Sequence, residues 1–206
     1  MDDSSTQRPI LQRLRTILWV AVAAAVIAAV ALFSMQQQNS AEAPVAQATL
    51  GGPFTLTDGK GQSFSSTRLA GKPYAIFFGF TRCGDVCPTT LGRLVKLRRQ
   101  AGGDDAFNIV FVTIDPDNDG PKEVGQYAEL FGSPIIGLTG SKAAIGQVKR
   151  QYGIYAEPNP QPIGEGDMMN HTSSVLLYDR RGQLAGMISG HEGDASAVQK
   201  LRALLT

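Results

Sequence analysis

The sequence predicts an α/β fold in which helices cover a largely parallel sheet that is closed by an antiparallel hairpin. Continuous apolar runs at 72–80 and 107–114 have the composition of strands buried on both faces. Segments with helical apolar spacing separate these runs, as expected when crossover helices join parallel strands. Near the C-terminus, two apolar segments flank the turn sequence at 179–182, a pattern typical of a hairpin.

The first half of the domain supplies one hairpin, two strands and a helix. Alternating apolar residues around Asp58-Gly59-Lys60-Gly61 predict an N-terminal β-hairpin, and the run at 72–80 predicts a buried strand. Apolar residues at helical spacing then predict a helix from Pro88 to about Gln100, with its basic residues on the solvent face. The run at 107–114 predicts the second buried strand.

The second half repeats this alternation. Helices are predicted at 121–131, where Asp119 is a possible cap, and at 141–152, with a short strand between them at 134–138. A hairpin then leads to a last helix, for which Asp194 is the predicted cap. The complete order predicts a thioredoxin-like sandwich with an N-terminal β-hairpin.

The N-terminal region predicts a single transmembrane helix. Residues 17–33 form 17 consecutive apolar residues, and the segment 16–35 gives 20 residues, about 30 Å of helix, which matches a bilayer core. Arg8, Arg13 and Arg15 precede the segment, so the positive-inside rule places the N-terminus in the cytoplasm and the rest of the chain across the membrane.

The alternative is a cleaved signal peptide. Its small-residue signature, Ala46-Gln47-Ala48, lies far beyond the apolar stretch, which is also longer than a usual signal core. We therefore expect four parts: a cytoplasmic N-terminus at 1–15, an anchor at 16–35, a Gln/Ala/Ser-rich tether at 36–49 and a folded domain at 50–206. The predicted location is a bacterial inner membrane, with the domain in the periplasm.

The composition does not favour partners that are attracted by a large net charge of the whole protein. Lys and Arg total 19 and Asp and Glu total 18, which does not favour nucleic acid or another polyanion as a partner. No nucleotide-binding loop or hydrolytic triad is evident. A local site must therefore select the partners.

Four residues are predicted to meet at one edge of the sheet. Cys83 and Cys87 are the only cysteines, and Cys83 follows the first buried strand as Asp115 follows the second. His171 precedes a strand that is expected to run antiparallel to these two. Because ligands collect at the carboxyl ends of parallel strands, the four residues form a candidate site.

Two thiolates and an imidazole suit Cu(I) or Zn(II), and a structural zinc site normally needs four protein ligands. Arg82 and the helix N-terminus are expected to favour thiolate over thiol. Asp115 would orient a ligand or meet a partner. A structural disulfide and a redox dithiol remain alternatives, although the pair lacks the C-x-x-C spacing of thioredoxins.

Other residues that could bind a metal receive no firm role. Met168 and Met169 lie in a long segment rich in Pro and Gly at 157–170, predicted to be a functional or mobile loop, and could supply thioethers or pack within it. For His191 a structural role is favoured over that of a ligand.

Three stretches resemble the Sco/SenC family of membrane-anchored copper chaperones: "GFTRCGDVCPTT", "FVTIDPDND" and "NHTSSVLLYDRRG". The resemblance extends from about Gly52 to the C-terminus. It implies that Cys83, Cys87 and His171 bind copper, as Cu(I) with Cu(II) as a further oxidation state. It also implies delivery of copper to the dinuclear copper site of cytochrome c oxidase subunit II, with other periplasmic copper chaperones or thiol reductants as further partners.

The sequence departs from the family pattern at two positions. Arg82 stands where the family often has His, and Gly84 where it often has Pro. Neither is a required ligand, but both bear on cysteine acidity and loop stiffness. Some relatives are thought to reduce the cysteines of the oxidase, so a periplasmic thiol–disulfide oxidoreductase that uses Cys83 and Cys87 is the alternative function.

Overall fold

The computed structural model describes residues 50–158, 169–171 and 173–206 together with six positions between 18 and 28, and at 158 and 169–171 it describes only the backbone. The six positions are helical and belong to a unit at 1–48, whereas a second compact unit covers 49–206. Among the described residues, no helix combines the length and apolar character needed to cross a membrane. Most of the predicted anchor and all of the predicted tether lie outside the described residues.

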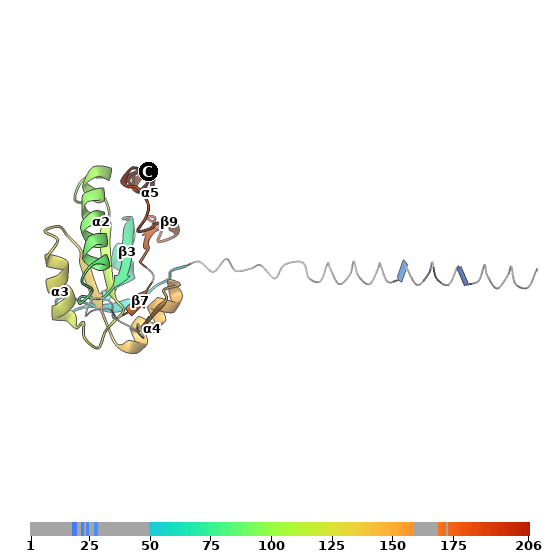
Figure 1. The fold of residues 1–206 in the computed structure, drawn as a ribbon, viewed down its shortest axis with the longest axis horizontal. Coiled ribbons are helices and arrows are strands. Elements are labelled where there is room, and N and C mark those ends of the chain that lie inside the picture. Colours follow the sequence, from blue (N-terminus) through green and yellow to red (C-terminus); the bar gives the residue numbers. More distant parts are fainter. Residues whose placement is uncertain are drawn as a thin grey trace, which may run out of the picture. The chain divides into compact units, whose positions relative to one another are not determined.

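The second unit is built on a seven-stranded sheet with the order β2-β1-β5-β4-β3-β8-β9. Strands β3, β4 and β5 are parallel. Beside β3, the sheet continues with β8, which is antiparallel to β3, and β9, which is antiparallel to β8. Beside β5, it continues with β1, which is antiparallel to β5, and β2, which is antiparallel to β1. This arrangement confirms the predicted parallel core and both hairpins (Figure 1). The strands are β1 (Thr55–Asp58), β2 (Ser63–Ser65), β3 (Tyr74–Gly79), β4 (Asn108–Thr113), β5 (Ile136–Thr139), β8 (Val175–Tyr178) and β9 (Leu184–Ile188).

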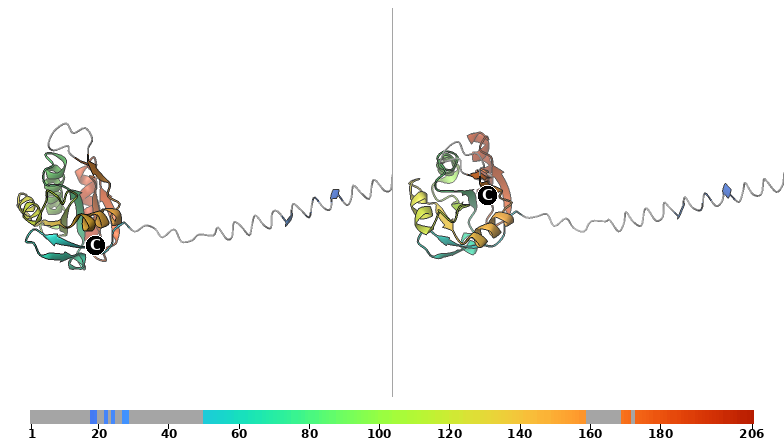
Figure 2. Two further views of the ribbon diagram at one scale, coloured as in Figure 1. Left: turned by 90° about the horizontal axis from the view of Figure 1, so that it is seen from below. Right: turned by 60° about the horizontal axis from the view of Figure 1, so that its bottom comes forward.

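Helices cover both faces of the sheet. The helices are η1 (Ser66–Leu69), α2 (Val86–Gly102), α3 (Pro121–Glu129), α4 (Lys142–Gln151) and α5 (Asp194–Leu205). Helices α2 and α3 lie on one side of the sheet and α4 on the other, while α5 packs along α2 (Figures 1 and 2). Each helix predicted within the domain at 50–206 is present, although α2 begins two residues before the predicted Pro88.

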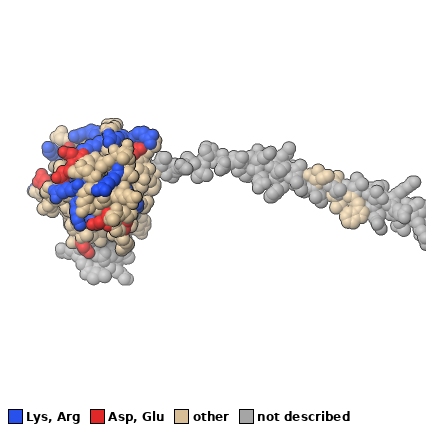
Figure 3. Space-filling view, turned by 90° about the horizontal axis from the view of Figure 1, so that it is seen from above, with Lys and Arg blue, Asp and Glu red and all other residues tan. Residues whose placement is uncertain are grey.

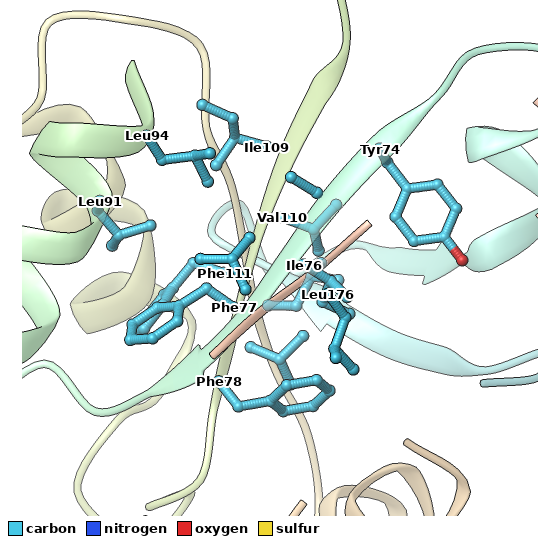
Figure 4. Close-up of a cluster of buried hydrophobic side chains, with 14 of the residues drawn as sticks. Tyr74, Ile76, Phe77, Phe78, Leu91, Leu94, Ile109, Val110, Phe111 and Leu176 are labelled. Carbon is cyan, nitrogen blue, oxygen red and sulfur yellow. The ribbon is translucent and has the colours of Figure 1, made fainter. Parts of the chain in front are cut away.

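The core forms because the central strands are apolar on both faces. Figure 4 shows Leu91 and Leu94 of α2 on the same side of the sheet as Phe77 and Phe111. On the opposite face, Phe78 packs against the Tyr152 ring at 5.6 Å. Burial of each large side chain contributes roughly 1.5–3 kcal/mol, so the two-sided core holds β3 and β4 rigidly beneath the residues that follow them.

The ends of the predicted loop at 157–170 form a small second sheet. Strands β6 (Ala156–Pro158) and β7 (Met169–His171) pair antiparallel, with Ala156 opposite His171. The loop prediction is wrong at these ends, because the ladder depends on two short segments meeting in space and leaves no periodic signal in the sequence. The remainder of the predicted loop lies outside the described residues.

Two predicted helix caps are wrong. The residue before α3 is Gly120, and the Asp119 carboxylate bonds to residues outside the helix. Asp194 is the first residue of α5, and its carboxylate accepts hydrogen bonds from Arg93 at 2.8 Å and Lys96 at 3.3 Å on α2. In both cases the carboxylate was predicted to cap its own helix, but it accepts hydrogen bonds from residues on other elements instead.

One basic residue of α2 is buried, against the expectation that all of them face solvent. The Arg98 side chain is 1% exposed, and its guanidinium donates to the Phe107 and Pro134 carbonyls at 3.2 and 3.0 Å. It also donates to Ser133 Oγ at 2.5 Å. Arg98 therefore links α2 to the loops before β4 and β5.

Charged side chains of both signs share the surface of the domain. Figure 3 shows Lys and Arg side chains alongside Asp and Glu side chains on one face. Three ion pairs at 2.8–2.9 Å show this interleaving: Arg93–Asp194, Arg99–Asp104 and Lys200–Glu192. The pattern agrees with the nearly balanced charge of the sequence.

Candidate metal centre

The two cysteines lie where β3 gives way to α2. Strand β3 ends at Gly79, and the Cys83 N–H donates to the Phe80 carbonyl at 3.2 Å in the turn that follows. Cys87 lies in the first turn of α2. Cys83 is 7% exposed and Cys87 is fully buried. The parallel pairing of Gly79 with Thr113 of β4 places the turn at the carboxyl edge of the sheet, as predicted.

The Cys83 sulfur occupies the N-terminus of α2. The Cys87 backbone N–H points to Cys83 Sγ at 3.4 Å, whereas Asp85, which precedes the helix, provides no side-chain cap. No disulfide joins the two sulfurs. Backbone N–H groups at a helix N-terminus stabilise negative charge, so this contact supports the predicted thiolate character at Cys83.

Cys87 does not follow that expectation. The hydrogen bond with Cys83 raises the pKa of the Cys87 thiol, burial raises it further, and the nearby charges of Cys83 and Asp119 act in the same direction. Two adjacent buried thiolates repel each other unless a cation lies between them. The surroundings of Cys87 therefore favour its thiol until a metal ion replaces the proton.

The raised pKa of Cys87 predicts a loss of stability at high pH. A thiol whose folded pKa exceeds its unfolded value stabilises the fold fully below the unfolded pKa, about 9.0. This contribution falls as the pH rises above that value. We expect the thermal midpoint of the reduced, metal-free chain to drop between about pH 8.5 and pH 10 and to drop less in Cys87→Ala. Equal drops in both proteins, measured under anaerobic conditions, would contradict the prediction.

Asp119 anchors the turn that carries Cys83. Its fully buried carboxylate accepts hydrogen bonds from the Thr81 backbone N–H at 2.9 Å, Thr81 Oγ1 at 2.6 Å and Thr113 Oγ1 at 2.6 Å. Its carbonyl accepts from Thr139 Oγ1 of β5 at 2.6 Å. One residue thus joins the ends of β3, β4 and β5 directly beneath the cysteine turn.

Asp115 lies at the same edge and contacts the residue before Cys83. Its carboxylate pairs with the Arg82 guanidinium at 2.8 Å and accepts from the Asn118 amide at 3.0 Å. Arg82 was expected to act on the thiols, yet its guanidinium forms an ion pair with Asp115. The ion pair links the cysteine turn to the turn after β4, and Asp115 remains a proposed supporting residue.

The path of the backbone places His171 near this edge of the sheet. It lies in β7, and β8 begins four residues later and runs antiparallel to β3, as predicted. Between these strands, Ser173 lines a small cavity of about 50 Å³ together with Thr89 and Thr90 of the first α2 turns. The segment after His171 therefore passes beside the start of the helix that bears Cys87.

The described side chains do not by themselves form a complete ligand set. Among them, no three His, Cys, Asp or Glu side chains are close enough to hold a metal ion, and the His171 side chain is not one of those described. Met168 lies outside the described residues, and Met169 is described only by its backbone in β7. His191 is exposed between β9 and α5.

Three residues of this region escaped the sequence-based prediction. Asp119 was predicted to be a helix cap, although Thr81, two residues after β3, and Thr113, the last residue of β4, could have indicated a shared polar partner. Gly79 was read only as part of a strand, but a Cβ there would lie 2.7 Å from Cys87 Sγ. Tyr127 lies within the helix predicted at 121–131, but the sequence analysis gave it no role, and nothing in the sequence indicated that it lies near the cysteines.

The comparisons with known proteins agree with this geometry. The SCO1/SenC family model matches residues 42–206. The chain belongs to the SCO1/SenC family. Among curated relatives, it is 30% identical to mitochondrial SCO2 of Saccharomyces cerevisiae over 83% of this chain and 58% of that protein. It is 35% identical to a SCO2-like protein of Rickettsia prowazekii over 65% of this chain and 66% of the relative.

The chain spans little more than half the length of the first curated relatives of the family, 58% of yeast SCO2 and 52% of the human SCO1 homolog. Among solved structures, Bradyrhizobium japonicum ScoI with copper bound is 35% identical, with a TM-score of 0.66 over 75% of this chain and 99% of that one. Arabidopsis thaliana ScoI with copper bound is 28% identical, with the same TM-score and coverages. Copper is therefore the metal bound in these related Sco structures.

A more distant structure adds a description of the family. BsSco, which is 23% identical with a TM-score of 0.60 over 75% of this chain and 92% of that one, is described as a member of the Sco family of cytochrome c oxidase assembly proteins. At that identity the likeness supports the thioredoxin-like fold alone.

Proposed function

We propose that this chain is a membrane-anchored copper chaperone whose domain at 50–206 binds copper through Cys83, Cys87 and His171. It delivers the copper to the dinuclear copper site of cytochrome c oxidase subunit II. The observation that carries the proposal is the pair of buried thiols at the start of α2, in a family that includes solved structures with copper bound.

The chemistry of the thiol pair supports copper as the cargo. Thiolate ligands select soft ions such as Cu(I), and the positive charge of the ion compensates the charge that the Cys87 environment disfavours. Two sulfurs and one imidazole leave the ion three-coordinate. An acceptor thiolate can then join before a donor ligand leaves.

The different exposures of the two cysteines suggest an order of transfer. Cys83 is 7% exposed, whereas Cys87 is fully buried against the sheet. An incoming acceptor thiolate therefore reaches the copper from the side of Cys83. Cys87 holds the ion longest and is the last ligand to be replaced.

The membrane context of this function is part of the proposal. The apolar segment at 16–35 would anchor the chain once in a bacterial inner membrane, with 1–15 in the cytoplasm. The tether at 36–49 would let the domain reach an oxidase partner in the same membrane. Other periplasmic copper chaperones or thiol reductants would load copper or keep the cysteines reduced.

A second candidate function is thiol–disulfide exchange with the cysteines of the oxidase copper site. The observation that favours it is the contrast between the two thiols. Cys83 receives a helix N-terminal N–H, while Cys87 is held protonated beside it. Such a pair resembles an attacking and a resolving cysteine. Exchange needs only the two sulfurs, whereas copper binding also needs His171.

The test is a Cu(I) competition titration of the reduced chain against a chromogenic chelator. We expect one tightly bound copper per chain and an affinity at least about a hundredfold weaker in His171→Ala, because a ligand is lost. His191→Ala is the matched control, since His191 is the only other histidine, and it should bind like the wild type. Glutathione exchange should be nearly unchanged in both variants.

Two results would count against the chaperone. Failure of the wild-type chain to bind Cu(I) tightly would exclude it. Tight binding that is indifferent to His171 would remove His171 from the ligand set and favour the thiol reductase.

A further inference from the structure

Tyr127 carries a buried hydroxyl that has no hydrogen-bond partner among the described residues. The residue is 8% exposed, and its oxygen is shielded from solvent. Its ring packs against Phe111 of β4, with ring centroids 5.1 Å apart, and against Phe131 at 5.5 Å. A buried polar group without a partner costs free energy, so this hydroxyl needs an explanation.

Two other buried tyrosines show how this fold usually satisfies such groups. The Tyr178 hydroxyl donates to the Leu50 carbonyl at 2.9 Å, and the Tyr152 hydroxyl donates to the Gly52 carbonyl at 3.1 Å. Both rings lie within the core, as does that of Tyr127. Core position alone therefore does not explain the unpaired hydroxyl of Tyr127.

The neighbourhood of Tyr127 includes the thiol pair. A Cβ built on Gly79 would lie 2.7 Å from Cys87 Sγ and 3.2 Å from the Phe111 ring, so the sulfur and the ring meet over the same glycine. Tyr127 packs on that ring. Burial raises the pKa of the Tyr127 hydroxyl, and among the nearby charges Cys87 contributes most, followed by Cys83 and Asp119. The hydroxyl thus stays protonated and lies within electrostatic range of both sulfurs.

We propose that the Tyr127 hydroxyl donates a hydrogen bond to the Cys87 sulfur when that sulfur is a copper-bound thiolate, and that it positions this ligand. The inference rests on the proposed function. A thiol is a weak acceptor and a thiolate a strong one, so the donor gains its partner when copper replaces the Cys87 proton. Tyr127 then stabilises the loaded site at the expense of the empty one.

Asp119 is the competing acceptor. Its carboxylate already accepts from Thr81 and Thr113, but an ionised carboxylate has room for a further donor. The two assignments make opposite predictions. A hydroxyl bound to Asp119 would stabilise the empty protein as much as the loaded one, whereas a hydroxyl reserved for the thiolate contributes only after copper binds.

The experiment uses the full chain in mild detergent and compares Tyr127→Phe with Tyr178→Phe, each of which removes one buried hydroxyl. In Tyr127→Phe we expect Cu(I) affinity to fall about tenfold, the value of a hydrogen bond to a charged group. The sulfur-to-copper charge-transfer band of the Cu(II) adduct should move to longer wavelength, because the sulfur loses a donor. The thermal midpoint of the metal-free chain should stay the same or rise.

The control should show the reverse pattern. Tyr178→Phe loses its bond to the Leu50 carbonyl, so its metal-free chain should melt at a lower temperature while copper affinity and the absorption band stay unchanged. If the wild-type chain binds copper and Tyr127→Phe has the same Cu(I) affinity and the same absorption band, the inference is overturned, but the proposed function is not. A lower melting temperature of metal-free Tyr127→Phe without a change in the band would assign the hydroxyl to Asp119. A wild-type chain that binds no copper would overturn both.

Discussion

Asp119→Ala is expected to lower the free energy of unfolding by at least about 3 kcal/mol. The substitution removes three hydrogen bonds to a fully buried carboxylate and leaves the donors of Thr81 and Thr113 without an acceptor. Because Thr81 begins the turn that carries Cys83, the turn also loses its attachment to β4. Copper affinity should therefore fall together with stability.

Asp117→Ala is the matched control for this prediction. Asp117 lies two residues away, and its partner Lys142 is 2.8 Å distant, but the two side chains are 60% and 74% exposed. An exposed ion pair contributes little, so this variant should lie within about 1 kcal/mol of the wild type. Denaturant unfolding monitored by fluorescence measures both. Similar losses in the two variants would show that the buried network at Asp119 does not hold the turn.

Gly79→Ala is expected to destabilise the domain by about 1–3 kcal/mol and to disturb the copper site. The added Cβ would lie 2.7 Å from Cys87 Sγ, 3.0 Å from the Phe77 ring and 3.2 Å from the Phe111 ring. These groups belong to the packed core and cannot all move aside. The first turn of α2 must shift, and Cys87 shifts with it.

Gly92→Ala, on the helix that bears Cys87, is expected to have the opposite effect on stability. Gly92 is exposed on α2, and a Cβ there meets open space. Alanine is favoured over glycine in a helix interior, so this variant should gain about 0.5–1 kcal/mol with unchanged copper affinity. Thermal unfolding and the Cu(I) titration together test the pair. A Gly79→Ala chain with wild-type stability and affinity would show that the site tolerates displacement of the helix.

Much of the architecture was predictable because its signals are local. Buried positions follow one another in β3 and β4 and recur at helical spacing in α2. The apolar residues at these positions are therefore visible as a local pattern in the sequence. The parallel direction of these strands then follows because a helix that crosses over between two strands joins them in parallel with a right-handed connection. The position of Cys83 and Asp115 at one edge of the sheet follows from the same topology.

Other features arise only when distant segments meet. Strands β6 and β7 pair across a segment that appeared irregular, and Asp119 and Asp194 bind partners on other elements instead of capping their own helices. No local pattern encodes these contacts. They depend on where the packed core places each backbone segment.

The type of fold, the two cysteines and the family resemblance could be predicted before folding is considered, because residue identity and spacing carry this information. The folded structure was needed to show which thiol is fully buried and that its pKa is raised. The folded structure also shows that Asp119 anchors the cysteine turn and that the Tyr127 hydroxyl has no hydrogen-bond partner within the described part of the chain. The physical reason is that solvation, hydrogen bonding and charge proximity are properties of position in the folded chain, and these positions come from elements far apart in sequence.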